Sequence, residues 1–231
     1  MTYEYIDRNV ARIRDRMDRA RIQAGREDEV LLLAAVKSAE VDEILYLHRQ
    51  HGICDVGENR VQQLMSRWEA LPHDSLRVHF IGSLQTNKVK YIIDKVCMIH
   101  SVDSWRLARE IDRQAEKHGL VMDILVEINC GREEAKGGLL PEEVADFCES
   151  LRSLAHVNLR GFMTMAPKCE QKDDYFKYFQ ETYQLIIDIW QKKLHNISRP
   201  VISMGMSDSF EEAILAGSDI VRIGRSLFLR N

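Results

Sequence analysis

The sequence lacks the features that mark secreted, membrane or nucleic-acid-binding proteins. Its five cysteines are odd in number and show no close pairs of the kind found in zinc sites or redox motifs. No apolar run approaches the roughly 20 residues that span a membrane, and the N-terminus has no basic stretch followed by an apolar one. With 32 basic against 36 acidic residues, the chain has no positive excess for nucleic acid. We therefore expect a cytoplasmic protein with reduced thiols and no membrane or nucleic-acid partner.

No low-complexity linker or internal repeat divides the 231 residues, so a single domain over residues 1–231 is expected. The first segment, residues 3–24, is predicted as a helix ended by Gly25, because apolar residues recur at spacings of three and four. The stripe comprises Ile6, Val10, Ile13, Met17 and Ala20. Arginines crowd this helix, but aspartates interleave them, which indicates a solvated face of mixed charge.

Short apolar runs then alternate with amphipathic segments, as is typical of strand-helix units around a parallel sheet. Eight runs are predicted as strands: residues 30–36, 53–56, 77–81, 98–102, 122–128, 158–163, 201–204 and 220–223. Helices are predicted to begin near Val41, Glu58, Asn87, Ser104, Pro141, Asp173 and Ser207. Eight parallel strands favour a closed barrel, so the predicted fold is an α/β (β/α)8 TIM barrel with an extra N-terminal helix. A doubly wound open sheet is the alternative.

Lys37 stands at the end of the first predicted strand, after an unbroken apolar run from Val30 to Val36. An amine at the edge of a core loses part of its hydration, which makes it a better nucleophile towards a carbonyl. A lysine that merely ends the strand and extends into solvent is the alternative. The last two predicted strands favour the reactive interpretation, because each ends in a glycine-containing turn.

These turns are Ser203-Met204-Gly205-Met206-Ser207 and Arg222-Ile223-Gly224-Arg225. Barrels often bind phosphate between the loops after the seventh and eighth strands. Glycine lets the backbone approach an anion, the amides of Gly224 and Arg225 would open a short helix, and Ser207 can add a hydroxyl. Glycines that serve only tight turns are the alternative. A nucleophilic lysine together with a phosphate site predicts pyridoxal 5'-phosphate as cofactor.

Further candidate cofactor-binding residues lie at or near the same strand ends. Arg222 is expected to point into the barrel mouth, where it would keep a pyridine nitrogen unprotonated; an ion pair at the rim is the alternative. Less specific candidates are Asn59, His79, Met163, Ser203 and Lys136. A histidine or methionine in an apolar strand is more often a core residue, and a lysine beside two glutamates is more often solvated.

Taken in order, these segments resemble the pyridoxal phosphate homeostasis protein family, the YggS/PROSC-type proteins. The resemblance covers nearly the whole chain and includes Ala35-Val36-Lys37, Gly57-Glu58-Asn59, His79-Phe80-Ile81-Gly82, Gln85-Thr86-Asn87-Lys88, Lys136-Gly137-Gly138, Gly161-Phe162-Met163, Met204-Gly205-Met206-Ser207-Asp208 and Val221-Arg222-Ile223-Gly224. It implies a barrel like the N-terminal domain of alanine racemase, an aldimine at Lys37 and phosphate contacts at Ser207, Gly224 and the next residue. Val36 and Arg225 depart from the family pattern, where Ser or Thr often precedes the lysine and Thr often follows the final glycine.

The resemblance implies that the protein buffers or delivers the cofactor, with pyridoxal-phosphate-dependent apo-enzymes as possible recipients. The predicted barrel uses nearly all of the chain, whereas alanine-racemase-like enzymes carry a further β-domain that supplies a tyrosine acid/base. An imine without an opposing acid/base should racemise amino acids poorly. We therefore expect a monomeric carrier rather than an enzyme. A small racemase or related amino-acid enzyme is the rival interpretation, and a cofactor-free interaction protein is a third.

Overall fold

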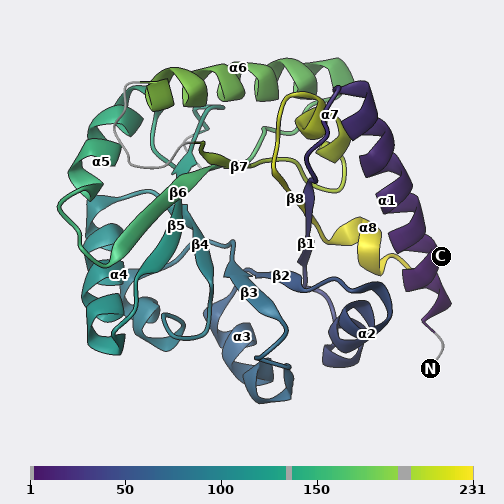
Figure 1. Ribbon diagram of the computed structural model, residues 1–231, viewed down its shortest axis with the longest axis horizontal. Coiled ribbons are helices and arrows are strands. Elements are labelled where there is room, and N and C mark those ends of the chain that lie inside the picture. The colour runs from purple at the N-terminus through teal and green to yellow at the C-terminus, as the bar shows by residue number, and fades with distance from the viewer. Residues whose placement is uncertain (1–2, 134–136, 192–198, 231) are drawn as a thin grey trace.

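The computed structural model describes residues 3–133, 137–191 and 199–230, and in this part of the chain eight parallel strands close into a barrel in sequence order (Figure 1). Each strand pairs with the next, and β8 pairs with β1. The strands are β1 (Leu31–Ala35), β2 (Asp55–Glu58), β3 (Arg77–Phe80), β4 (Met98–Val102), β5 (Met122–Ile128), β6 (Val157–Thr164), β7 (Val201–Ser203) and β8 (Ile220–Ile223). The predicted barrel is confirmed.

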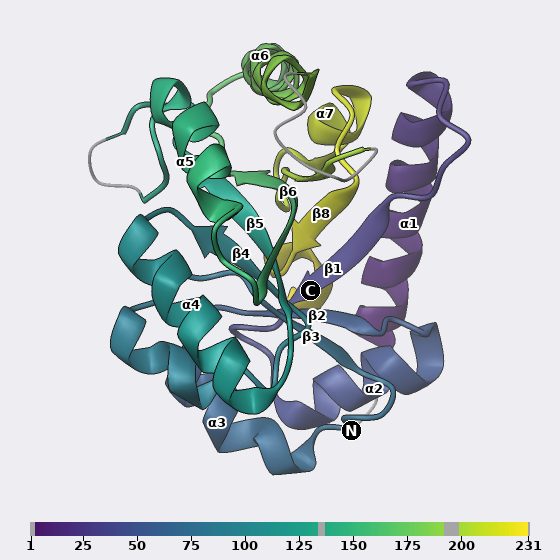
Figure 2. The same cartoon turned by 60° about the vertical axis from the view of Figure 1, so that its left-hand side comes forward.

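Helices surround the strands, and α4 and α5 lie outside β4, β5 and β6 in two views (Figures 1 and 2). The α-helices are α1 (Glu4–Gln23), α2 (Val41–His51), α3 (Val61–Arg67), α4 (Trp105–His118), α5 (Val144–Leu151), α6 (Lys172–Gln191), α7 (Phe210–Leu215) and α8 (Arg225–Phe228). The described residues also form the short three-ten helices η1 (Trp68–Ala70), η2 (Thr86–Tyr91) and η3 (Pro141–Glu143).

Four of the predicted helix starts differ from the structure. The segment expected near Pro141 begins as η3 and becomes α5 only at Val144, and the helix expected near Ser207 begins at Phe210. The helix expected near Glu58 begins at Val61, because Glu58 still belongs to β2 and stands opposite Phe80 of β3. The segment expected to form a helix near Asn87 forms only η2, in which the Lys88 amide donates to the Gln85 carbonyl over three residues rather than four.

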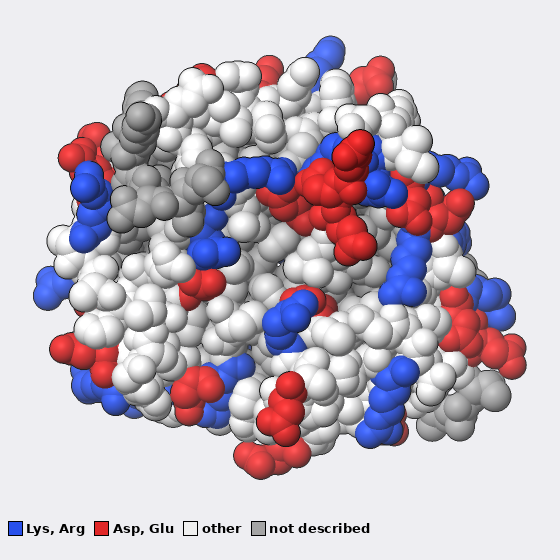
Figure 3. Space-filling model, viewed as in Figure 1, with Lys and Arg blue, Asp and Glu red and all other residues white. Residues whose placement is uncertain are grey.

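Helix α1 precedes the barrel as predicted and buries its apolar stripe, with Ile6, Val10 and Ile13 almost fully enclosed. It packs against α7 and α8, so the first and last helices lie side by side (Figure 1). Several of its arginines pair with acidic neighbours, including Arg19 with Asp15, whereas Arg12 and Arg14 donate to Asn9 and to the His51 carbonyl. On the molecular face shown in Figure 3, basic and acidic side chains are interspersed rather than gathered by sign.

The main hydrophobic core lies between the strands and the surrounding helices. Inside the barrel the apolar cluster is small and consists of Leu33, Ala35, Ile81 and Ile220. Buried polar side chains occupy much of the rest of the interior, which most barrels fill with branched apolar residues. No helix in the described part of the chain is long and apolar enough to cross a membrane.

Candidate functional site

Lys37 lies in a turn two residues beyond the end of β1, and its side chain is exposed. Val36, directly before it, is fully buried. The expectation that Lys37 loses hydration at the edge of the core is therefore wrong, because the chain has already left the barrel wall at this position. The Lys37 side chain therefore contacts solvent at the carboxyl end of β1.

Helix α3 holds the backbone of this turn from below. Gln63 donates from Nε2 to the Lys37 carbonyl at 2.9 Å, and Arg67 donates from Nη1 to the Val36 carbonyl at 3.2 Å. Arg67 is itself buried and forms an ion pair with Glu58, whose Oε1 lies 3.3 Å from Arg67 Nε. Burial raises the pKa of Glu58 to about 7, although the Arg67 guanidinium opposes the shift. Two side chains of α3 thus hold the backbone of the turn, whereas the Lys37 side chain is exposed.

The closing pair of strands brings the turn after β8 against the end of β1. Leu33 stands opposite Arg222 and Ala34 opposite Ile223. A Cβ atom on Gly224 would lie 2.7 Å from the Ala35 carbonyl oxygen, closer than real Cβ atoms come. Only glycine fits here without moving the backbone. Gly224 therefore lets the turn after β8, which is predicted to bind phosphate, pack against the end of β1, which precedes Lys37.

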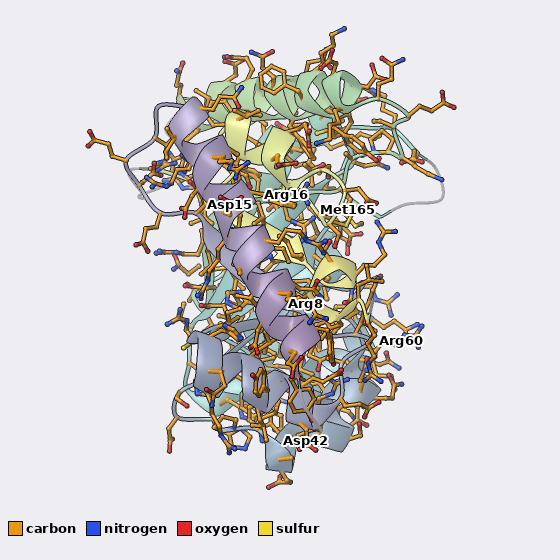
Figure 4. All side chains as sticks on the ribbon, turned by 90° about the vertical axis from the view of Figure 1, so that its right-hand side faces the viewer. Arg8, Asp15, Arg16, Asp42, Arg60 and Met165 are labelled. Carbon is orange, nitrogen blue, oxygen red and sulfur yellow. The ribbon has the colours of Figure 1, made fainter. Side chains whose placement is uncertain are left out.

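Ser207 and Ser226 meet beside this junction, where the Ser226 amide donates to Ser207 Oγ at 3.3 Å. A cavity of about 570 Å³ opens there, lined by Arg12, Arg16, Ser207, Asp208, Arg225, Ser226 and Leu229. Figure 4 shows Arg16 on the side of α1 that faces α7, where it pairs with Glu211 at 2.6 Å. The exposed Arg225 side chain pairs with Asp208. A hydroxyl, a backbone amide and nearby guanidinium groups suit an anion such as phosphate.

Arg222 is buried at the carboxyl end of β8 and points into the barrel rather than to an acidic rim partner. Its Nη1 donates to the Ser203 carbonyl at 2.8 Å and to Ser203 Oγ at 2.7 Å, and its Nη2 donates to the Thr164 carbonyl at 2.9 Å. Burial lowers the pKa of Arg222 to about 10, with Glu127 opposing the shift. The guanidinium therefore stays protonated at neutral pH.

The other sequence candidates are distributed around the barrel. The Oδ1 atom of Asn59 is buried and has no hydrogen-bond partner among the residues that the structure describes, so this amide oxygen can serve a ligand. Met163 is buried and stands in register between Glu127 and Ser203. His79 uses both ring nitrogens inside the barrel, with Asp55 and His100 as partners. Arg60 and Met165, which follow β2 and β6, lie on the same side as α8 (Figure 4). Lys136 lies outside the described residues.

Sequence reasoning missed four buried polar residues that shape the interior and its support: Asp55, Arg67, His100 and Glu127. His100 and Glu127 interrupt apolar strand runs, and that interruption was the available signal. A charged or imidazole side chain inside an eight-stranded barrel needs partners from other strands, so such residues identify a functional interior.

Burial raises the pKa of Glu127 to about 7, with Asp103 adding to the shift and Arg222 opposing it. Between about pH 4.5 and 7 the unfolded chain loses this proton while the folded protein keeps it, so stability falls as pH rises. Above about pH 7 Glu127 is ionised in the folded protein as well, and the full loss of stability is present. We expect Glu127→Gln to raise the free energy of unfolding by up to about 3 kcal/mol near pH 8 and by little near pH 4.

Urea unfolding of the variant and the parent protein at the two pH values measures this difference. Glu116→Gln, on the exposed face of α4, is the control and should change neither value. An equal effect of Glu127→Gln at both pH values would contradict the prediction.

Comparison with known proteins first defines the class. The family model described as alanine racemase, N-terminal domain, matches residues 6–231. The structure of alanine racemase from Clostridium difficile superposes with a TM-score of 0.75 at 16% identity, covering 99% of this chain and 57% of that chain, and so supports the fold alone. The protein is an alanine-racemase-type α/β barrel.

Two further relatives define the family more narrowly. The pyridoxal phosphate homeostasis protein of Aquifex aeolicus is 40% identical over 219 residues, which are 95% of each chain. The structure of PipY from Synechococcus elongatus, with PLP bound, superposes with a TM-score of 0.82 at 26% identity and covers 97% of this chain and 100% of that one. The chain belongs to the pyridoxal phosphate homeostasis protein family, as its motifs indicated.

Proposed function

We propose that this protein binds pyridoxal 5'-phosphate through Lys37 and holds it for exchange with other proteins of the cell. The single observation that carries the proposal is the convergence of the Lys37 turn with the Gly224 and Ser207 turns at one end of the barrel. The bound form of PipY and the names of the curated relatives support it. When bound, the cofactor supplies an aldehyde that condenses with a primary amine, and a phosphate that needs hydrogen-bond donors.

The residues of this chain divide the binding work. Lys37 supplies the amine, and α3 keeps its backbone in place through Gln63 and Arg67. The Ser207 hydroxyl, which the Ser226 amide holds in place, would donate to the phosphate, and Gly224 would allow the backbone to approach it. Arg222 would present a fixed cation to the pyridine nitrogen, and Asn59 and Met163 would border the ring. A proton is disfavoured on a ring nitrogen beside a guanidinium, which weakens carbanion chemistry.

A carrier role is favoured over turnover by the exposure of Lys37, since an amine open to solvent allows the cofactor to leave by hydrolysis. The chain matches 95% of the length of a relative named pyridoxal phosphate homeostasis protein, and this name also supports a carrier role. We propose one barrel domain over residues 1–231, acting as a monomer in the cytoplasm and supplying apo-enzymes. The five cysteines, all within the described residues, form no disulfide, which fits a reducing compartment.

Mixing the purified protein with pyridoxal 5'-phosphate tests the proposal. We expect a new absorbance band from the covalent adduct, and after borohydride reduction a mass increase of one cofactor on the peptide that contains Lys37. A protein that shows neither change would refute cofactor binding. Exchange of the α-proton of amino acids in deuterated water, measured over a panel, tests the rival racemase function; sustained exchange would refute the carrier role.

A further inference from the structure

A continuous chain of buried polar groups crosses the barrel interior from Asp55 to Arg222. His79 Nε2 lies 3.0 Å from Asp55 Oδ1, and His79 Nδ1 lies 3.0 Å from His100 Nε2. His100 Nδ1 lies 3.3 Å from Ser203 Oγ, which lies 2.7 Å from Arg222 Nη1. His100 and Ser203 are fully buried, and the other three residues are at most 5% exposed. This series of hydrogen-bonded groups runs from β2 through β3, β4 and β7 to β8, and it joins residues up to 167 positions apart in the sequence.

The two ends of this chain fix its direction. The Arg222 guanidinium can only donate hydrogen bonds, and an ionised carboxylate can only accept them. Although burial opposes ionisation, hydrogen bonds from His79 and Arg77 hold the pKa of Asp55 below its usual range. Burial, with smaller contributions from His79 and Arg222, lowers the pKa of His100 well below its usual value, so this ring carries a single proton. The positions of the remaining protons then follow from satisfying every group.

Ser203 Oγ accepts from Arg222, so its own proton is free to be donated to His100 Nδ1. His100 then donates from Nε2 to His79 Nδ1, and His79 donates from Nε2 to Asp55. In the opposite arrangement His100 donates from Nδ1 to Ser203 Oγ. This oxygen then accepts from both His100 and Arg222, and the buried hydroxyl proton of Ser203 has no acceptor among these five residues. Buried polar groups rarely leave a donor unused, so the first arrangement is favoured.

We propose that Ser203, His100, His79 and Asp55 form a one-directional hydrogen-bond relay that positions the Arg222 guanidinium and supplies it, across the barrel, with a counter-charge. The relay itself follows from the hydrogen-bond contacts. The identity of the ligand near Arg222 rests on the proposed function. The relay aligns three dipoles head to tail between a cation and an anion, an arrangement in which hydrogen bonds strengthen one another.

The relay also decides which part of Arg222 remains available. Its bonds to Ser203 and Thr164 use both protons of Nη1 and one of Nη2. Among the described residues no partner takes the Nε proton or the second Nη2 proton, so these are the donors that Arg222 can offer a ligand. Arg222 keeps its two carbonyl contacts if Ser203 loses its hydroxyl, but it loses the connection to Asp55. Ser203, His100 and His79 are therefore positioning residues, and His79 acts on the cofactor through Arg222 rather than by contact.

Nitrogen-15 NMR of the histidine side chains in the cofactor-free protein tests the relay directly. We expect both His79 and His100 as neutral rings protonated at Nε2 and bare at Nδ1 at neutral pH. A proton on Nδ1 of His100, or a doubly protonated His79, would overturn the proposed direction. This measurement does not depend on the protein binding any cofactor.

Three variants separate a relay from simple core packing. Ser203→Ala and Asp55→Asn should each shift the nitrogen resonances of both histidines, although each touches only one of them. Asp123→Asn is the matched control, because Asp123 also stands at the start of a strand and accepts a hydrogen bond, from Asn158 at 2.5 Å, without contacting a histidine. It should leave both rings unchanged. If Asp55→Asn does not fold, Ser203→Ala, which removes a single oxygen, decides the question alone.

Binding of pyridoxal 5'-phosphate tests whether Ser203 positions Arg222 for the cofactor. We expect Ser203→Ala to weaken its binding roughly fivefold and to shift the adduct absorbance band, as expected for one hydrogen bond to a charged group. Unchanged affinity and spectrum in a folded variant would refute the positioning role, even with the predicted tautomers. If the parent protein binds no cofactor while its histidines show the predicted tautomers, the proposed function fails and the relay stands.

Discussion

Lys37→Ala is expected to abolish the adduct absorbance and the borohydride-stable mass increase, because it removes the amine at the meeting point of the three turns. Without the covalent bond, the phosphate and ring contacts alone should hold pyridoxal 5'-phosphate at least about 100-fold more weakly. Because the Lys37 side chain is exposed and its backbone is held by α3, the free energy of unfolding should change by less than about 0.5 kcal/mol. Absorbance titration and urea unfolding measure the two quantities.

Lys117→Ala is the control, since Lys117 is an exposed lysine in the last turn of α4 and should form no specific adduct. Retention of the band and of a single trapped cofactor in Lys37→Ala would reject Lys37 as the principal amine. Peptide mapping of that product would then identify the lysine that replaces it, with Lys136 as the first candidate to examine.

Gly161→Ala is expected to destabilise the barrel by about 3 kcal/mol, the largest effect on stability that a single added methyl group should have in this chain. A Cβ atom at Gly161 would lie 1.9 Å from the Val201 carbonyl oxygen and 2.5 Å from the Val201 nitrogen. Gly161 stands opposite Val201 where β6 pairs with β7, beside the register shift between β5 and β6. The two backbones cannot separate without breaking this pairing.

Gly119→Ala supplies the comparison. Gly119 ends α4 with a φ angle of 65° and has open space around it, so alanine there should cost only about 1 kcal/mol through backbone strain. Gly161 also has a positive φ angle, 157°, so its loss combines backbone strain with steric conflict. Urea unfolding of both variants therefore measures the steric part as the excess loss of Gly161→Ala over Gly119→Ala. Equal losses would show that the close approach of β6 and β7 relaxes easily.

The fold was predictable because each strand falls in a short, mainly apolar segment and these segments alternate with amphipathic helical ones. Lys37, Ser207 and Gly224 could be selected because strand ends in a barrel share one face, which turns positions far apart in sequence into neighbours. The start of α3 was mispredicted because Glu58 looks like a residue of a first helical turn. Its ion pair with Arg67 keeps it buried at the end of β2 instead.

The interior relay could not be predicted for a different reason. A lone histidine in an apolar strand has the same local pattern whether it is a core residue or part of a network. His79 and His100 gain their significance only from strand register, which places them beside each other and beside Ser203, 103 residues after His100. The exposure of Lys37 depends in the same way on a single turn, whose geometry is set by α3.

Helix α1 also holds the segment from Leu227 to Leu229 in place. Asn9, buried on α1, donates from its amide to the carbonyls of Leu227 and Leu229, each at 3.0 Å. The seam at which β8 meets β1 is therefore braced from outside by a helix that belongs to neither strand. Trimming α1 would loosen the segment that carries Ser226, so a deletion far from Ser207 in sequence would disturb the cavity that Ser207 and Ser226 line.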